Sequence, residues 1–154
     1  MNNFVNLSSP IRQEQLNQIY NVVRRGRDLT VRFNGIAHRF KFYFQRDEEF
    51  RSSKEYIALL EAVSSLGFFV HGFNRMLSQE KKPGWNYVES QFLHIRKATQ
   101  ELKDILTGLS FLTQKLSTIE QVNFNKEICA AFNKTDSYLL LIDNHFQYLN
   151  SLAA

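Results

Sequence analysis

The sequence predicts an α+β fold that is predominantly α-helical: an N-terminal helix, one antiparallel β-hairpin, and then four helices that form a bundle against the apolar face of the hairpin. Two patterns indicate this class. Apolar residues recur with helical spacing over most of the chain, and an Asn-Gly pair at positions 34 and 35 separates two segments of alternating side chains. The 154 residues, 44% of them apolar, suit a single domain over 1–154 with one sizeable core.

The chain opens with residues 1–8, which we expect to be flexible. Ser9 at the N-cap and Pro10 at the first helical position are a start signal, because proline lacks the amide hydrogen that would have no partner there. Apolar residues then recur on one face until Gly26, a residue type that often ends helices. We therefore expect a helix over about residues 10–25.

Residues 29–33 and 36–44 are expected to be the two strands of the hairpin, because Asn-Gly tolerates the positive φ angles of a type I′ turn. A two-residue loop places Phe33 opposite Ile36, and this register gives the ribbon two unlike faces. The apolar face holds Leu29, Val31, Phe33, Ile36, Phe40, Phe42 and Phe44. The polar face holds Thr30, Arg32, Ala37, Arg39, Lys41 and Tyr43. Residues 10–46 would thus form a basic unit of one helix and one hairpin.

Residues 53–152 are expected to form the helical bundle. A capping box of Ser52 and Glu55 predicts the start of a helix over about residues 53–78. The Lys-Lys-Pro-Gly sequence at 81–84 is a clear break, and its shortness predicts that the next helix runs antiparallel to the first.

Two further capping boxes predict later helix starts: they are Asn86 with Glu89 and Ser117 with Glu120. The first of them begins a long helix over about residues 86–116. The second begins a shorter helix, which the polar residues 133–136 are expected to break. A last helix then runs from Tyr138 almost to the C-terminus.

Few residues offer catalytic or metal-binding chemistry. The four His and the single Cys match no metal-ligand spacing, so we expect no metal, no cofactor and no catalytic residue. Cys129 stands in a small apolar run, where a buried and inert thiol is expected. His145 is centred on an apolar helical face, where a core histidine is expected. An enzyme that uses His145 or Cys129 is the second alternative to the function given below.

From the sequence we expect no secretion signal and no membrane span. No basic segment followed by an apolar run occurs at the N-terminus, and no stretch of about 18 consecutive apolar residues occurs anywhere. One Cys cannot build a disulfide framework, which fits a reducing compartment. We expect a soluble cytoplasmic protein, with export by a route that reads no N-terminal signal left open.

Charge is distributed unevenly along the chain. Residues 1–46 hold eight Lys and Arg against two Asp and Glu, whereas residues 47–154 hold eleven against thirteen. The first third is therefore strongly positive within a chain whose formal net charge is only +4. A partner recognised through charge would meet this third.

These observations predict a non-catalytic interaction protein, an adaptor or an inhibitor or regulator of another macromolecule, that binds an acidic protein partner through the basic hairpin face. The predicted partner-binding residues are Arg24, Arg25, Arg27, Arg32, Arg39, Lys41 and Tyr43. An adjoining apolar helix surface would complete the interface, with Ile57, Phe68 and Leu140 as candidates. The first alternative is a nucleic-acid-binding regulator that uses the same basic face. The apolar candidates leave a homodimer open as well.

Overall fold

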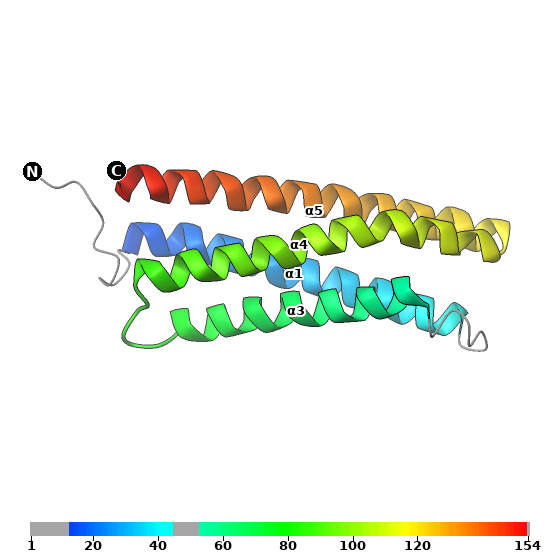
Figure 1. The fold of residues 1–154 in the computed structure, drawn as a ribbon, viewed down its shortest axis with the longest axis horizontal. Helices are drawn as coiled ribbons and strands as arrows, with labels where there is room; N and C mark the ends of the chain where they lie inside the picture. The colour runs from blue at the N-terminus through cyan, green and yellow to red at the C-terminus, as the bar shows by residue number, and fades with distance from the viewer. Residues whose placement is uncertain (1–12, 45–52, 154) are drawn as a thin grey trace, which may run out of the picture.

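The computed structural model describes residues 13–44 and 53–153, and within them the chain is an all-α bundle of four long helices (Figure 1). The helices are α1 (Gln13–Tyr43), α3 (Lys54–Leu77), α4 (Trp85–Leu112) and α5 (Thr118–Ala153), with a 3₁₀ turn, η1 (Thr113–Lys115), between the last two. Successive helices run in opposite directions along the long axis (Figure 1). Each helix packs against two neighbours, in the order α1, α3, α4, α5 and back to α1. Helices α3 and α5 therefore occupy opposite corners.

The predicted β-hairpin is wrong, because residues 29–43 continue helix α1 without interruption. The buried side chains of this segment follow a helical spacing: they are Leu29, Phe33, Ile36, Ala37, Phe40 and Phe44. Val31 and Phe42, which the alternating pattern placed on the same apolar face, are 70% and 63% exposed. Gly35 costs a helix only about 1 kcal/mol relative to Ala. Full burial of Phe33 and of Phe40 stabilises the helix by about 1.5–3 kcal/mol each, so packing overrides the turn signal.

Gly26 lies in the middle of α1, so the predicted helix end at this residue is also wrong. The Tyr138 hydroxyl of α5 donates a hydrogen bond to the Val22 carbonyl oxygen at 2.8 Å. A Cβ atom at position 26 would collide with that hydroxyl and lie only 2.9 Å from Cγ2 of Val70. Glycine is thus required here for close approach between helices rather than for a helix end. Residues 1–12, which include the predicted flexible segment and the Ser9-Pro10 start signal, lie outside the described residues.

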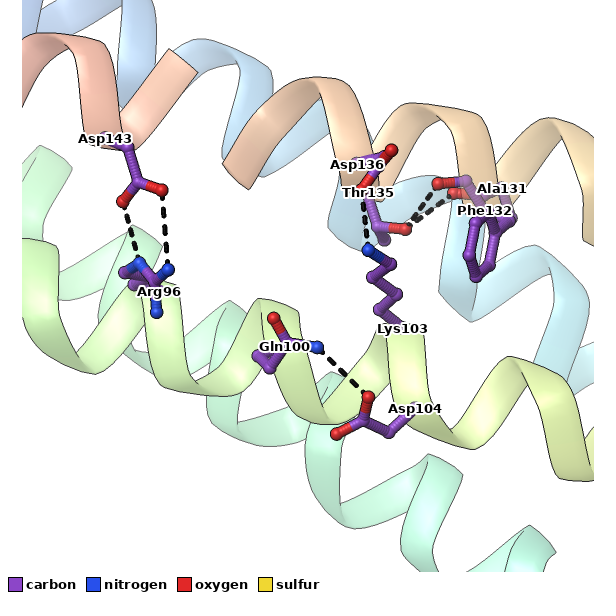
Figure 2. A network of polar contacts seen from close by, with 9 residues as sticks. All are labelled: Arg96, Gln100, Lys103, Asp104, Ala131, Phe132, Thr135, Asp136 and Asp143. Atoms are coloured by element: carbon purple, nitrogen blue, oxygen red, sulfur yellow. Dashed lines mark hydrogen bonds and ion pairs between the residues drawn. The ribbon is translucent and has the colours of Figure 1, made fainter. Parts of the chain in front are cut away.

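The predicted break at residues 133–136 does not occur, and α5 is one continuous helix. Asn133, Lys134 and Asp136 point to the surface, where polar side chains do not disturb the helix. Thr135 is buried, and its hydroxyl donates back to the carbonyl oxygens of Phe132 and Ala131 at 2.8 and 3.1 Å (Figure 2). Its polar group is therefore satisfied inside the helix.

The other helix bounds lie close to those expected. The N-cap of α3 is Ser53, whose hydroxyl accepts from the Tyr56 amide at 3.2 Å. The predicted cap, Ser52, lies outside the described residues. Asn86 falls inside the first turn of α4 rather than at its cap. The capping box before α5 is confirmed: its Ser117 hydroxyl accepts from the Glu120 amide, and the Glu120 carboxylate accepts from the Ser117 amide, both at 3.4 Å.

The core is a layer of aliphatic and aromatic side chains along the bundle axis. Its largest fully buried members are Tyr138, Phe33, Phe40, Phe73, Phe92, Ile19, Ile36, Leu59, Leu66, Leu77 and Ile95. In the described part of the chain, α3 is long and apolar enough to cross a bilayer by length and composition. The most apolar 18-residue stretch of α3 is 39% buried inside the bundle.

Candidate functional site

Helix α1 carries the positive charge of the described bundle. It holds six Lys and Arg against two Asp and Glu, whereas α3 holds two of each sign and α4 three of each. Helix α5 is acidic, with two Lys against four Asp and Glu. The charge asymmetry of the sequence thus becomes a basic helix packed beside an acidic one.

Three cations meet at a hollow between α1 and α5, which we call the basic hollow. It measures about 240 Å³ and is lined by Arg25, Asp28, Leu29, Arg32, Lys134 and Tyr138. Two guanidinium groups, one ammonium group and a single carboxylate belong to its lining, so the hollow has an excess of positive charge. Burial raises the pKa of Tyr138, with Arg25 opposing the shift, so the ring remains a neutral wall of the site.

Helical spacing explains why part of the predicted site gathers here. Arg25, Arg32 and Arg39 are seven residues apart, so they share the face of α1 that meets α5. Arg25 donates to the Ser137 hydroxyl at 3.3 Å, and Arg39 forms an ion pair with Glu127. Arg32 makes no ion pair with any residue in the described ranges. It is therefore the cation of this row that stays available to a ligand.

The remaining predicted cations lie on other faces of α1. Arg24 and Arg27 line a second hollow, of about 330 Å³, which adjoins α3 through Asn74. Arg24 donates there to the Asn21 side-chain oxygen at 2.9 Å. Lys41 is exposed and lies about 200° around the helix axis from Arg39, because the two are two positions apart. The hairpin would have placed these two cations side by side, and the helix separates them.

Tyr43 and the three apolar candidates also fall on separate surfaces. Tyr43 packs edge-on against Phe124 of α5, with ring centroids 5.3 Å apart, and remains 40% exposed. Ile57 and Phe68 of α3 are 45% and 74% exposed, and Leu140 of α5 is 62% exposed. Because α3 and α5 occupy opposite corners, the apolar candidates do not form one patch.

Two lining residues of the basic hollow, Lys134 and Tyr138, were missed by the sequence analysis. Lys134 fell in the predicted break, and Tyr138 was treated only as the start of a new helix. The available signal is their spacing. Ala131, Tyr138 and Ile142 continue one buried helical stripe across the supposed break, with Lys134 four residues before Tyr138.

The residues considered for catalysis do not assemble. Cys129 is exposed, which corrects the expectation of a buried thiol. His145 is half-buried, and desolvation lowers its pKa. The two lie sixteen residues apart on one straight helix, about 24 Å along its axis, too far for a nucleophile and its base. Among the described residues, no three His, Cys, Asp or Glu side chains are grouped to hold a metal.

Comparison of the chain with protein-family models, with curated proteins and with solved structures gave no match. The basic hollow therefore stands as the chemical feature from which a function can be argued. Clustered guanidinium and ammonium groups recognise carboxylate or phosphate oxygens by charge-assisted hydrogen bonds.

Proposed function

We propose that this chain is a non-catalytic interaction protein, an adaptor or regulator of another macromolecule, that binds an acidic protein segment at the basic hollow. Arg25, Arg32 and Lys134 receive carboxylate groups of the partner. The single observation that carries this proposal is that Arg32 lines the hollow without an ion-pair partner in the described chain, while Arg39 on the same face is paired. A cation left free in a concave, excess-positive site is suited to an external anion.

The local charge pattern favours a short acidic segment over a nucleic acid. A DNA duplex presents one phosphate about every 1.7 Å of its axis and needs cations along a track. Here Asp28 is one of the residues that line the hollow. The neighbouring helix α5 also carries Glu127 and Asp136, both within seven positions of Lys134. Arg39 and Lys103 already pair these two carboxylates, and α5 holds only two Lys of its own. A long polyanion therefore finds no continuous row of cations across α5, whereas a few partner carboxylates fit the hollow itself.

Arg24 and Arg27 add a second, weaker contribution. Both lie on the adjoining side of α1 and line the hollow next to α3. At this position they extend the positive field of α1 beyond the basic hollow. Peripheral charges of this kind raise association rates more than they raise affinity.

The test is a binding measurement with two labelled probes, an oligoglutamate peptide and a DNA duplex, followed by fluorescence anisotropy. The R25A/R32A variant should bind the peptide at least about tenfold more weakly, since two charge-assisted hydrogen-bonding groups are lost. The K54A/K97A variant removes the same charge from exposed positions of α3 and α4 and should bind the peptide like the unmodified protein. Equal loss in both variants would show that only net charge matters and would contradict the proposal.

Salt dependence separates the acidic protein from the nucleic acid. Duplex binding releases counterions in proportion to the phosphates contacted, so its affinity falls steeply with salt. We expect a shallow dependence for the peptide and weak, nonspecific binding of the duplex. Tighter binding of the duplex than of the peptide at physiological salt, lost in R25A/R32A, would replace this proposal by a nucleic-acid-binding function.

A further inference from the structure

We propose that the outer face of α5 pairs, antiparallel and two-fold symmetric, with α5 of a second copy of this chain. The face consists of Val122, Lys126, Cys129, Asn133, Asp136 and Leu140, and we call it the outer stripe. This surface is distinct from the basic hollow, because none of its six residues lines that hollow.

Apart from the ion pair of Asp136 with Lys103 of α4, the side chains of the outer stripe make no hydrogen bond or ion pair with the described residues of the bundle. The side of α5 that faces the core carries Phe124, Ile128, Ala131, Thr135, Tyr138 and Ile142, all buried. The stripe lies on the opposite side of the helix, where Val122 and Leu140 are 48% and 62% exposed. One turn before Val122, Ile119 is 75% exposed. Branched apolar side chains thus stand in water at both ends of the stripe, which is typical of an interaction surface.

The spacing of the stripe is that of a coiled-coil seam. Its residues are separated alternately by four and three positions, a period of 3.5, which lets a second helix follow it. Positions 123, 130 and 137, on one flank, hold only Asn, Ala and Ser. Small side chains on a flank let two helix backbones approach closely, and no like-charged pair is brought together there.

The order of side chains makes the stripe complementary to itself. A two-fold axis that crosses the outer stripe at the level of position 131 places residues equally far from that position opposite one another. Val122 then faces Leu140 of the second copy, Lys126 faces its Asp136, and Cys129 faces its Asn133. Each contact occurs twice, so the pairing buries two apolar contacts and forms two ion pairs of opposite charge. This charge match favours a second copy over an unrelated partner.

Neighbouring contacts hold the acidic groups in place for this pairing. Oδ1 of Asp136 accepts from Nζ of Lys103 at 2.6 Å, and the Asp136 side chain remains 59% exposed, with room for Lys126 of the second copy (Figure 2). At the ends of the stripe, Ile119 comes opposite Asp143, whose charge Arg96 already pairs at 2.7 Å (Figure 2).

Hollows flank the middle of the stripe and leave space for incoming side chains. One, of about 470 Å³, lies between α4 and α5 and is largely apolar, with Leu106 and Phe132 among its lining residues. The other, of about 570 Å³, lies along α5 itself and includes Val122 and Lys126. Cys129 and Asn133 line both hollows, so the space is centred where the two-fold axis would pass.

Light scattering on the purified chain across a range of concentrations tests the pairing. The mass should rise from 18.1 kDa toward twice that value with concentration. The L140E variant places a carboxylate against Val122 of the second copy, so it should stay at the monomer mass. The control is F68E, which introduces the same carboxylate at another exposed apolar residue, on α3. It should behave like the unmodified chain. A monomer at every concentration, or dissociation by F68E instead of L140E, would overturn the proposal.

Thiol crosslinking tests the register. In N133C the native Cys129 meets Cys at position 133 of the second copy, so mild oxidation or a short bismaleimide should link the two chains efficiently. In L140C the same thiol would be linked only if the pairing shifted by one heptad. The C129S/N133C variant, which lacks the native thiol, should lose most of the product. Stronger linkage in L140C than in N133C would overturn the self-complementary arrangement.

Discussion

Two seams of the bundle, α1 against α5 and α3 against α4, hold helices together by different means. Beside the basic hollow, the α1–α5 seam holds one large ring, Tyr138, which fits against Gly26 and donates to the Val22 carbonyl oxygen. Other rings lie toward one end of this seam, where Phe124 of α5 packs against Phe40 and Tyr43 with centroids 4.6 and 5.3 Å apart. Two polar links also cross this seam, Arg25 with Ser137 and Arg39 with Glu127. These are long side chains that reach across the surface rather than fill the interior.

The α3–α4 seam is filled by rings. Phe73 packs at steep angles against Tyr87 and Phe92, with centroids 5.8 and 5.9 Å apart. Nearer the surface, Phe69 stacks on His94 at 4.4 Å with the rings nearly parallel. A site arises only where the packing between two helices leaves space. Interlocking rings fill the space between two helices, whereas long cations beside one deeply inserted ring leave the basic hollow open.

The largest effect should come from breaking the ring-filled seam. Phe73 is fully buried, so F73A loses its transfer free energy and leaves a cavity. We expect the free energy of unfolding to fall by about 3–5 kcal/mol. Urea unfolding followed by circular dichroism measures it. F68A, at a ring that is 74% exposed, should change stability by less than about 0.5 kcal/mol. Comparable losses in the two variants would mean that the seam does not depend on its buried rings.

Intermediate changes in stability, of opposite sign, are expected when Gly26 and Gly72 are each replaced by Ala. G26A brings a Cβ against the Tyr138 hydroxyl and Val70, so it should destabilise by about 1–3 kcal/mol despite the better helix propensity of alanine. G72A, on α3, meets nothing within 4 Å and should stabilise by about 0.5–1 kcal/mol. Thermal unfolding of the two variants compares them.

The double variant G26A/Y138F refines the same test. Removing the hydroxyl relieves the closest contact, so the combined loss should be smaller than the sum of the two single losses. Strict additivity would show that the loss of stability in G26A does not come from contact with the Tyr138 hydroxyl. The close approach of α1 and α5 at Gly26 would then not depend on that contact.

The smallest effect concerns the ion pair between Arg39 and Glu127. Its side chains are 50% and 20% exposed, so a double-mutant cycle of R39A and E127A should give a coupling of about 0.2–1 kcal/mol. Added salt should reduce that coupling, because exposed charges are screened. A coupling independent of salt would contradict a surface ion pair. Arg39 would then contribute more to the stability of the α1–α5 seam than a partly exposed ion pair does.

Helices α3 and α4 were predictable from the sequence within a few residues. Their apolar residues recur with a helical period over more than twenty positions, and Lys-Lys-Pro-Gly at 81–84 separates them. The capping box of Ser117 and Glu120 likewise depends on neighbours in the chain. Such signals are local, so no knowledge of the partner helices is needed to read them.

The segment 29–44 was not predictable in the same way. Phe40, Phe42 and Phe44 alternate, while Phe33, Phe40 and Phe44 also fit a helix, so the same side chains satisfy two periods. The Asn-Gly pair then favoured the hairpin. The choice was made by burial against α3 and α5, which exposes Phe42 and buries Phe40.

From the amino-acid sequence alone one can read that most of this chain is helical, that its first third is basic, and where α3 and α4 begin and end. These properties follow from side-chain type and from spacing within a few turns. Which cations lie together depends on tertiary packing, because Arg32 and Lys134 line the same hollow although they are more than one hundred positions apart. The contact of Tyr138 with Gly26 determines how closely α1 and α5 approach each other. Such long-range packing cannot be read from the spacing of residues within a few turns.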